Sequence, residues 1–223
     1  MISIVIPALD EERALPATLT AARIAVPAAQ VIVVDGGSRD ATREVAAAHP
    51  GVQVLIAERG RAAQMNAGAR AAWGDWLLFL HADTRLPRGA GLAIESLHAD
   101  IRAGCFRQAF DRRGRLLDLT SRLHNWRCEA TGIMYGDQAP FVRASEFAAV
   151  GGYPAGELED VRLSERLRER ASPVMLPLTV VTSARRFLAQ GEAASLARIL
   201  LILLQHRLGR RPVAGRRFFE PVR

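Results

Sequence analysis

The chain has 223 residues, of which 49% are hydrophobic and 24% are charged, and its formal net charge is +7. This composition is close to that of ordinary globular proteins, so it argues against disorder and against a fibrous repeat. The length suits one large domain with a substantial core. All 30 basic residues are Arg and they are scattered along the chain, without a nucleic-acid-binding signature. We therefore expect no nucleic-acid partner.

Four short apolar runs alternate with Ala- and Arg-rich segments in the first half of the chain. Continuous apolar runs are typical of strands buried on both faces, so we expect central parallel strands at 2–6, 31–34, 52–56 and 76–80. The composition between them predicts helices at 11–25, 39–48 and 61–72. This alternation indicates right-handed βαβ crossovers, and hence a Rossmann-like α/β fold with an open, mostly parallel sheet flanked by helices.

The second half is less regular. We expect strands at 104–110 and 173–183, and helices at 115–127, 157–170 and 192–208. The last of these helices has a very apolar centre. We divide the chain into a domain over residues 1–190 and a C-terminal amphipathic helix with a basic tail over 191–223. The three tryptophans are expected to pack in the core, with stacking on a sugar as the alternative for Trp126.

The cysteines and the N-terminal residues indicate the cellular compartment of the protein. Cys105 and Cys128 form no CxxC pair, and no His cluster has zinc spacing, so we expect neither a disulfide scaffold nor a thiolate metal site. The apolar stretch in "MISIVIPALD" is too short for a signal peptide and has no basic leader. We predict a cytoplasmic location.

Polar groups follow each of the first four predicted strands, in "PALDEE", "DGGSRD", "ERGRAAQMN" and "HADT". The ligands of an open α/β sheet bind beyond the carboxyl ends of its strands, so these segments should share one rim. A carboxylate there must be solvated, paired or metal-bound. We expect Asp83 to anchor Mg²⁺ or Mn²⁺, with His81 either a second ligand or a hydrogen-bond partner of a nearby carboxylate. Asp35 either is a functional residue of the same rim or caps the next helix after a tight turn.

Six blocks of sequence carry a family resemblance. They are "IVIPALDEE", "VIVVDGGSRDAT", "GRAAQMNAGARAAWGDWLLFLHADT", "GDQAPFVRASEFAAVGGY", "ELEDVRLSERL" and "TSARRF". Over about residues 1–190 the chain resembles family 2 glycosyltransferases with the GT-A fold (the nucleotide-diphospho-sugar transferase fold). It is most similar to a small bacterial subgroup of uncharacterised transferases that carries the same "HADT" and "SARR" blocks.

The resemblance implies roles for individual residues. Asp83 matches the last carboxylate of the metal-binding DXD motif, whose first aspartate is His81 here, and Asp160 matches the catalytic base, with Glu159 as an alternative. The residue before Glu11, usually Asn in the family, is Asp10. The implied nucleotide-binding residues are Pro7, Ala8, Glu11, Asp35, Ser38, Arg61 and Asn66.

Two further pairs are candidates for binding. Arg185 and Arg186 suit a departing diphosphate or a lipid phosphate, although a surface pair is an equal alternative. The resemblance places Asp137 and Gln138 in the acceptor pocket, whereas a simple turn would explain "GDQ" as well.

These residues suit the transfer of a sugar from a nucleoside diphosphate-sugar to a hydroxyl acceptor. A divalent cation would stabilise the leaving diphosphate, and a base would take the acceptor proton. The start of a helix favours an ionised carboxylate, so we expect Asp160 to stay unprotonated. A single displacement with one base predicts an inverting enzyme. The resemblance favours uridine diphosphate as the nucleotide.

Two other functions remain open. A nucleotidyltransferase would carry a Gly-rich basic loop after the first strand, where "PALDEE" is acidic. A catalytically inactive nucleotide-sugar-binding protein is the second alternative, because His81 weakens the metal motif.

The C-terminal segment "LARILLILL" is too short to span a bilayer, which needs about 20 apolar residues. We favour contact with the inner face of an anionic cell membrane, with packing on the domain or on a second subunit of a homodimer as the alternative. The flanking and following basic residues are Arg198, Arg207, Arg210, Arg211, Arg216 and Arg217.

Overall fold

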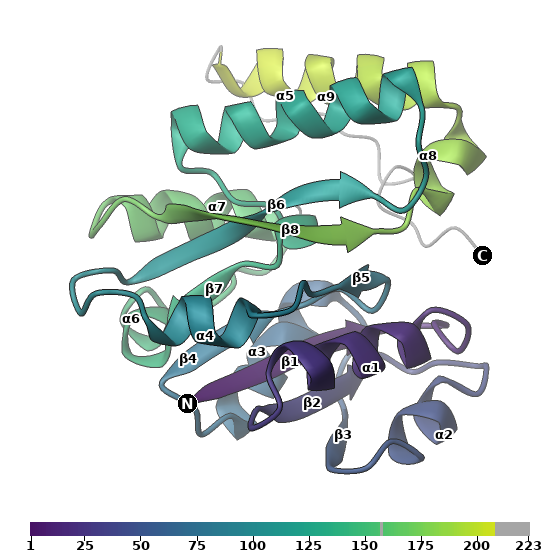
Figure 1. Ribbon diagram of the computed structural model, residues 1–223, viewed down its shortest axis with the longest axis vertical. Coiled ribbons are helices and arrows are strands. Elements are labelled where there is room, and N and C mark those ends of the chain that lie inside the picture. Colours follow the sequence, from purple (N-terminus) through teal and green to yellow (C-terminus); the bar gives the residue numbers. More distant parts are fainter. Residues whose placement is uncertain (157, 208–223) are drawn as a thin grey trace.

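The computed structural model describes residues 1–156 and 158–207. Within these residues the strands form one eight-stranded sheet in the order β3-β2-β1-β4-β7-β6-β8-β5 (Figure 1). The strands are β1 (Ile2–Ala8), β2 (Gln30–Asp35), β3 (Val52–Ile56), β4 (Trp76–Phe79), β5 (Thr84–Arg85), β6 (Ala103–Phe110), β7 (Phe141–Arg143) and β8 (Val174–Thr182). The helices are α1 (Leu15–Ala25), α2 (Thr42–Ala47), α3 (Arg61–Ala71), α4 (Ala90–Glu95), α5 (Arg115–Thr131), the 3-10 turn η1 (Gly136–Gln138), α6 (Ala144–Ala149), α7 (Glu159–Arg168), α8 (Arg185–Gln190) and α9 (Glu192–Arg207).

The first four strands run parallel, as the βαβ alternation predicted. β1 pairs with β2 on one side and with β4 on the other, so the ends of these strands meet at one rim. The prediction that all four are central is wrong for β3, which pairs only with β2 at the edge of the sheet. Its residues are half-buried or exposed for that reason.

The second half of the sheet has mixed directions. β7 runs antiparallel to both β4 and β6, whereas β6 and β8 are parallel. The sequence did not indicate β5, β7, α4, α6 or α8, because elements of two to six residues carry too little periodicity to be recognised.

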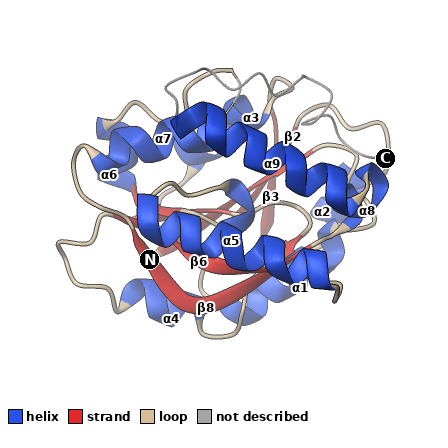
Figure 2. Ribbon diagram, turned by 90° about the horizontal axis from the view of Figure 1, so that it is seen from above, coloured by secondary structure: helices blue, strands red, loops and turns tan. Residues whose placement is uncertain are grey.

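Helices cover both faces of the sheet. Residues of α1, α2 and α4 pack on one face against the even-numbered side of β1, with Ile2, Ile4 and Ile6 all nearly fully buried. Residues of α3, α5, α6 and α7 pack on the other face, where Phe79 is central. The last helix, α9, lies alongside α5, as both Figure 1 and Figure 2 show.

The tryptophans differ from the expectation. Trp76 is buried in β4, with its ring edge-to-face against Phe141 at 5.6 Å between centroids. Trp73 is 56% exposed and Trp126 is 65% exposed, so the prediction of core packing is wrong for both. Trp73 precedes β4 in a surface connection, and Trp126 lies on the outward side of α5.

The predicted C-terminal helix is present as α9, and it exposes leucine side chains to solvent. No helix within residues 1–156 and 158–207 is long and apolar enough to cross a membrane. The side chains of Arg198 and Arg207 and the basic tail with Arg210, Arg211, Arg216 and Arg217 lie outside the described part of the chain. The exposed leucines are Leu200, Leu201 and Leu204.

Candidate active site

The rim of the sheet opens into two adjoining chambers. The first chamber lies at the ends of β1 and β4 and the start of α3, and it encloses about 1430 Å³ including its opening to solvent. The second chamber lies between the sheet, α5 and α7 and encloses about 1150 Å³ on the same measure. The side chains that line both are Arg61, His81, Asp83, Leu158 and Arg186.

Asp83 and Asp160 reach this cleft from distant parts of the sequence. Asp83 follows β4 and borders both chambers, and Asp160 lies in the first turn of α7 and borders the second. The two carboxylates therefore face a common space.

Asp160 is held by one hydrogen bond and is otherwise unsatisfied. Its Oδ2 accepts a hydrogen bond from the Gly136 N–H at 3.0 Å, whereas its buried Oδ1 has no hydrogen-bond partner among the described residues. Burial raises the pKa of Asp160 to about 7, the charge of Glu159 adds to this, and the charge of Arg61 opposes it. This raised pKa runs against the expectation that the helix start keeps the carboxyl fully ionised, because burial opposes the helix dipole.

Glu159, the alternative base, is committed to an ion pair. Its Oε1 lies 2.7 Å from Arg61 Nε, and the carboxylate is almost fully buried. Glu159 is therefore in contact with a cation, whereas Asp160 Oδ1 has no hydrogen-bond partner among the described residues.

His81 lies close to Asp160 across a glycine. A Cβ added to Gly136 would be 2.2 Å from His81 Nε2 and 3.1 Å from Asp160 Oδ2, so only glycine lets both side chains approach here. Burial, followed by the charge of Arg61, lowers the pKa of His81 to about 4, so the imidazole is neutral at pH 7. Its buried Nε2 has no hydrogen-bond partner in the described structure.

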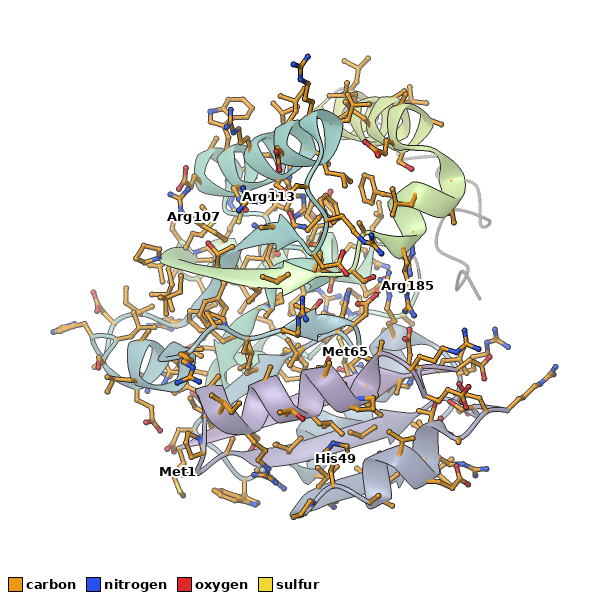
Figure 3. The ribbon with its side chains drawn as sticks, turned by 45° about the vertical axis from the view of Figure 1, so that its right-hand side comes forward. Met1, His49, Met65, Arg107, Arg113 and Arg185 are labelled. Atoms are coloured by element: carbon orange, nitrogen blue, oxygen red, sulfur yellow. The ribbon has the colours of Figure 1, made fainter. Side chains whose placement is uncertain are left out.

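Arg185 links two carboxylates at the border of the first chamber. Its side chain extends from α8 toward the half of the molecule that contains β1 (Figure 3). The guanidinium donates a hydrogen bond to Glu11 Oε1 and lies 3.2 Å from Asp83 Oδ2. Burial raises the pKa of Glu11 even though Arg185 opposes the shift. Arg186 has no ion pair within the described residues, and burial, followed by the charge of Arg61, lowers its pKa.

Only some of the predicted nucleotide-binding residues border the first chamber. Pro7, Ala8, Glu11 and Arg61 do so. The predicted residues that do not are Asp35, Ser38 and Asn66.

Those three side chains have structural partners. Asp35 is fully buried and accepts hydrogen bonds from the backbone N–H groups of Gly37 and Ser38 at 3.1 Å, as in the turn-capping alternative. Asn66 exchanges two hydrogen bonds with the backbone of Tyr153, at 2.8 and 2.9 Å. Their roles in nucleotide binding stay predictions.

The predicted acceptor pair divides between two environments. Asp137 borders the second chamber, and its Oδ1 lies 3.1 Å from His124 Nε2. Burial raises the pKa of Asp137, but the charge and hydrogen bonding of His124 outweigh it and lower the pKa to about 2. Gln138 is fully buried and accepts a hydrogen bond from the Tyr135 N–H, so it supports the η1 turn.

Most of the second chamber could not be recognised from the sequence. Its side chains come from β6, α5, α7 and α8, so no single motif contains them. The one local signal was the spacing of His124 and Arg127, three residues apart, which places both on one face of α5. The residues missed are Gln108, Phe110, Thr120, His124, Arg127, Tyr135 and Phe187.

A model of the family described as Glycosyl transferase family 2 matches residues 3–134. The chain belongs to glycosyl transferase family 2. The matched span includes Asp83 and ends before Asp160 and Arg185.

This family 2 member is also similar to individual proteins. A PGL/p-HBAD biosynthesis glycosyltransferase of Mycobacterium bovis BCG is 39% identical over 100 residues, which are 42% of this chain and 39% of that protein. The chain thus spans about two fifths of that relative's length.

Solved structures share its fold. Glucosyl-3-phosphoglycerate synthase from Mycobacterium tuberculosis superposes with a TM-score of 0.67 at 19% identity, covering 96% of this chain and 82% of that one. A mannosyltransferase from Pyrobaculum calidifontis gives a TM-score of 0.62 at 20% identity, covering 89% and 64%. The predicted GT-A fold is confirmed.

Proposed function

We propose that this family 2 member transfers a sugar, with inversion, from a nucleoside diphosphate-sugar in the first chamber to a hydroxyl acceptor in the second. The observation that carries the proposal is that Asp83 and Asp160 line one cleft where the two chambers join. A donor diphosphate near Asp83 and an acceptor hydroxyl near Asp160 would then meet across the anomeric carbon.

Asp160 is the proposed base. Its unpartnered Oδ1 is free to accept the hydroxyl proton, while the Gly136 N–H fixes Oδ2 and thereby the orientation of the carboxylate. A pKa of about 7 makes the carboxylate a stronger base than an exposed aspartate and still leaves it substantially ionised near neutral pH. Glu159, which is paired with Arg61, adds negative charge nearby. This charge favours the protonated form of Asp160, which results from the proton transfer.

Arg186 and Arg185 are the proposed ligands of the diphosphate. Arg186 borders both chambers and has no ion pair within the described residues, so its donors are available to phosphate oxygens. Arg185 already occupies the space beside Asp83, and a bound diphosphate would draw it away from Glu11 and Asp83 or share it with them.

The site fits a divalent cation held through Asp83. Among the described residues no group of three or more His, Cys, Asp and Glu side chains could hold a metal alone. Mg²⁺ and Mn²⁺ commonly take one or two carboxylates and complete their shell with water and phosphate oxygens, which Asp83 and a diphosphate would supply. Such a cation would neutralise charge on the leaving diphosphate. The Nε2 of His81 lies beside Gly136 without a hydrogen-bond partner among the described residues, so this geometry favours neither of the two roles expected for His81.

The structural neighbours support a nucleotide donor and a metal. The synthase was solved with Mn²⁺ and uridine diphosphate, and the mannosyltransferase with GDP-Man and Mn²⁺. Of the two nucleotides, the sequence resemblance favours uridine diphosphate for this chain.

Calorimetry with a panel of nucleoside diphosphates, with and without Mn²⁺, followed by a donor-hydrolysis assay, tests the proposal. We expect one nucleotide to bind more tightly with Mn²⁺ and its sugar conjugate to be hydrolysed. Asp83→Asn should remove the Mn²⁺ effect, whereas Asp118→Asn, at an exposed position of α5, should not. Binding without turnover would favour an inactive binding protein, and release of pyrophosphate from a nucleoside triphosphate would favour a nucleotidyltransferase.

We also propose that the outer surface of α5 and α9 contacts an anionic membrane. Its support is a set of exposed apolar side chains on two neighbouring helices, where solvent contact is unfavourable. Sedimentation with vesicles containing phosphatidylglycerol should recover the protein, and loss of binding in Leu200→Ser/Leu204→Ser would locate the contact. A dimer in solution that buries these helices would contradict it. The side chains are Leu116, Leu119, Trp126, Leu200, Leu201 and Leu204.

A further inference from the structure

Two polar side chains of the second chamber have no role in the proposed transfer step. Arg127 of α5 is 7% exposed and Gln108 of β6 is 2% exposed, and both border the chamber. The Nη2 atom of Arg127 and the Nε2 atom of Gln108 are buried without a hydrogen-bond partner among the described residues. Both atoms are donors, and neither group is placed beside the first chamber.

The surroundings of Arg127 do not compensate its charge directly. Its guanidinium lies over the ring of Tyr135, 4.0 Å from the centroid. The carboxylate of Asp137 is the nearby acidic group, but its Oδ1 contacts His124. No ion pair of Arg127 occurs within the described residues. A buried cation that no carboxylate contacts is costly, so this arrangement suits an anion that arrives with a ligand.

The backbone of Gln108 is held in place, while the Nε2 atom of its side chain has no partner among the described residues. Its backbone N–H donates to Asn125 Oδ1 at 2.9 Å, and its backbone carbonyl accepts from Asn125 Nδ2 at 3.0 Å. These bonds fasten β6 to α5, the helix that carries Arg127. The side-chain Nε2 therefore adds a fixed neutral donor to the same chamber.

Part of the chamber wall is apolar. Phe110 and Phe187 meet edge-to-face with centroids 4.7 Å apart, and Val161 of α7 borders the same space. Arg186 borders both chambers, whereas Arg127 and Gln108 border only the second. An anion at Arg127 would thus be bound separately from the donor diphosphate.

We infer that the acceptor carries an anionic oxygen group, either a carboxylate or a phosphate, which Arg127 and Gln108 bind while its apolar part contacts Phe110 and Phe187. This inference rests on the proposed function for the assignment of the second chamber to the acceptor. A guanidinium can donate two parallel hydrogen bonds to either group, and the amide of Gln108 supplies a further donor. The far end of the acceptor presents its hydroxyl to Asp160.

Calorimetry on the full chain with phenylacetate, phenyl phosphate and neutral methyl phenylacetate tests this subsite, with and without a nucleoside diphosphate. We expect at least one anion to bind tenfold or more tightly than the ester, and the better of the two identifies the preferred group. Arg127→Leu should abolish the difference, Arg127→Lys should keep part of it, and Gln108→Leu should reduce it several-fold. Arg122→Leu, at an exposed position of the same helix, should keep it.

Equal affinities for anion and ester, or no measurable binding of either anion, would overturn the inference. So would an anion preference that survives Arg127→Leu and disappears in Arg186→Leu, because the anion would then occupy the diphosphate position. Nucleoside diphosphate binding separates this from the proposed function: it should be unchanged in Arg127→Leu. Absence of nucleotide binding in the wild type would reject the proposed function and leave an Arg127-dependent anion subsite standing.

Discussion

The Asp83 carboxylate lies 3.2 Å from the guanidinium of Arg185, although one follows β4 and the other begins α8. The same guanidinium donates a hydrogen bond to Glu11. A cation of the protein thus lies where the proposed donor complex would place a metal ion or the diphosphate. Binding of the donor must therefore rearrange the contact between Arg185 and Asp83. This rearrangement can be tested by mutation.

Arg185→Gln should separate the two roles of this side chain. Without the competing guanidinium, Asp83 should bind Mn²⁺ several-fold more tightly in the absence of nucleotide. Nucleoside diphosphate affinity should fall by roughly 10- to 100-fold, as expected for one lost charge-assisted hydrogen bond. Titration of Mn²⁺ by electron paramagnetic resonance and calorimetry of the nucleotide measure the two effects. Arg122→Gln is the charge-matched control, and unchanged Mn²⁺ affinity in Arg185→Gln would contradict the idea.

Asp160→Asn should abolish transfer and stabilise the fold. Removal of the base should lower kcat by about 10²- to 10⁴-fold. Because the ionised carboxylate is buried beside Glu159, its replacement by a neutral isostere should raise the free energy of unfolding at pH 8 by on the order of 1–3 kcal/mol. Donor turnover and urea unfolding measure both, with Glu169→Gln as an exposed control near the end of α7. Full turnover in Asp160→Asn would reject its assignment as the base.

The pH dependence follows from the raised pKa of Asp160. In the wild type, kcat/KM should rise with pH and level off above about 7, where the carboxylate is ionised. Stability should change in the opposite sense. Between about 4, the ordinary value, and about 7, the folded chain keeps a proton that the unfolded chain has lost, so the Asp160 contribution to stability falls as pH rises. Over this pH range the free energy of unfolding should fall more steeply with rising pH in the wild type than in Asp160→Asn. The same pH dependence in both proteins would contradict this prediction.

Gly136→Ala should disturb the site more than the fold. The added Cβ would come within 2.2 Å of His81 Nε2, so the imidazole and the neighbouring Asp160 carboxylate would have to shift. We expect transfer to fall at least 100-fold, since small misplacements of a catalytic group have effects of this order. Gly114→Ala meets only ordinary contacts from 3.7 Å and serves as the control. Wild-type turnover in Gly136→Ala would show that the close approach is not needed.

Asn66→Ala tests a role implied by the family resemblance against the hydrogen bonds in the structure. Loss of its two bonds to the Tyr153 backbone should lower the free energy of unfolding by roughly 1–3 kcal/mol. The folded variant should bind the nucleoside diphosphate with wild-type affinity, whereas Arg186→Gln should show the reverse pattern. Weakened nucleotide binding at unchanged stability would instead support the role in nucleotide binding that the family resemblance implies for Asn66.

The sequence determined the part of the architecture that depends on local pattern. Continuous apolar runs identified β1, β2, β3 and β4, and the helical segments between them required parallel strands whose ends share a rim. The polar residues that follow β1, β3 and β4 could therefore be assigned to one cleft from the sequence alone, and they do border the first chamber. Family resemblance added Asp160, which no local pattern would have joined to Asp83.

Only the tertiary structure decided the electrostatic state and the partners of the site. Burial and the neighbouring Glu159 raise the pKa of Asp160, and these depend on packing from β4, η1 and α7 that no window of sequence contains. The second chamber is likewise assembled from single residues of several elements, among them Arg127 and Gln108. Hydrophobic periodicity reports which face of an element is buried, whereas desolvation and charge pairing depend on what distant segments place against it.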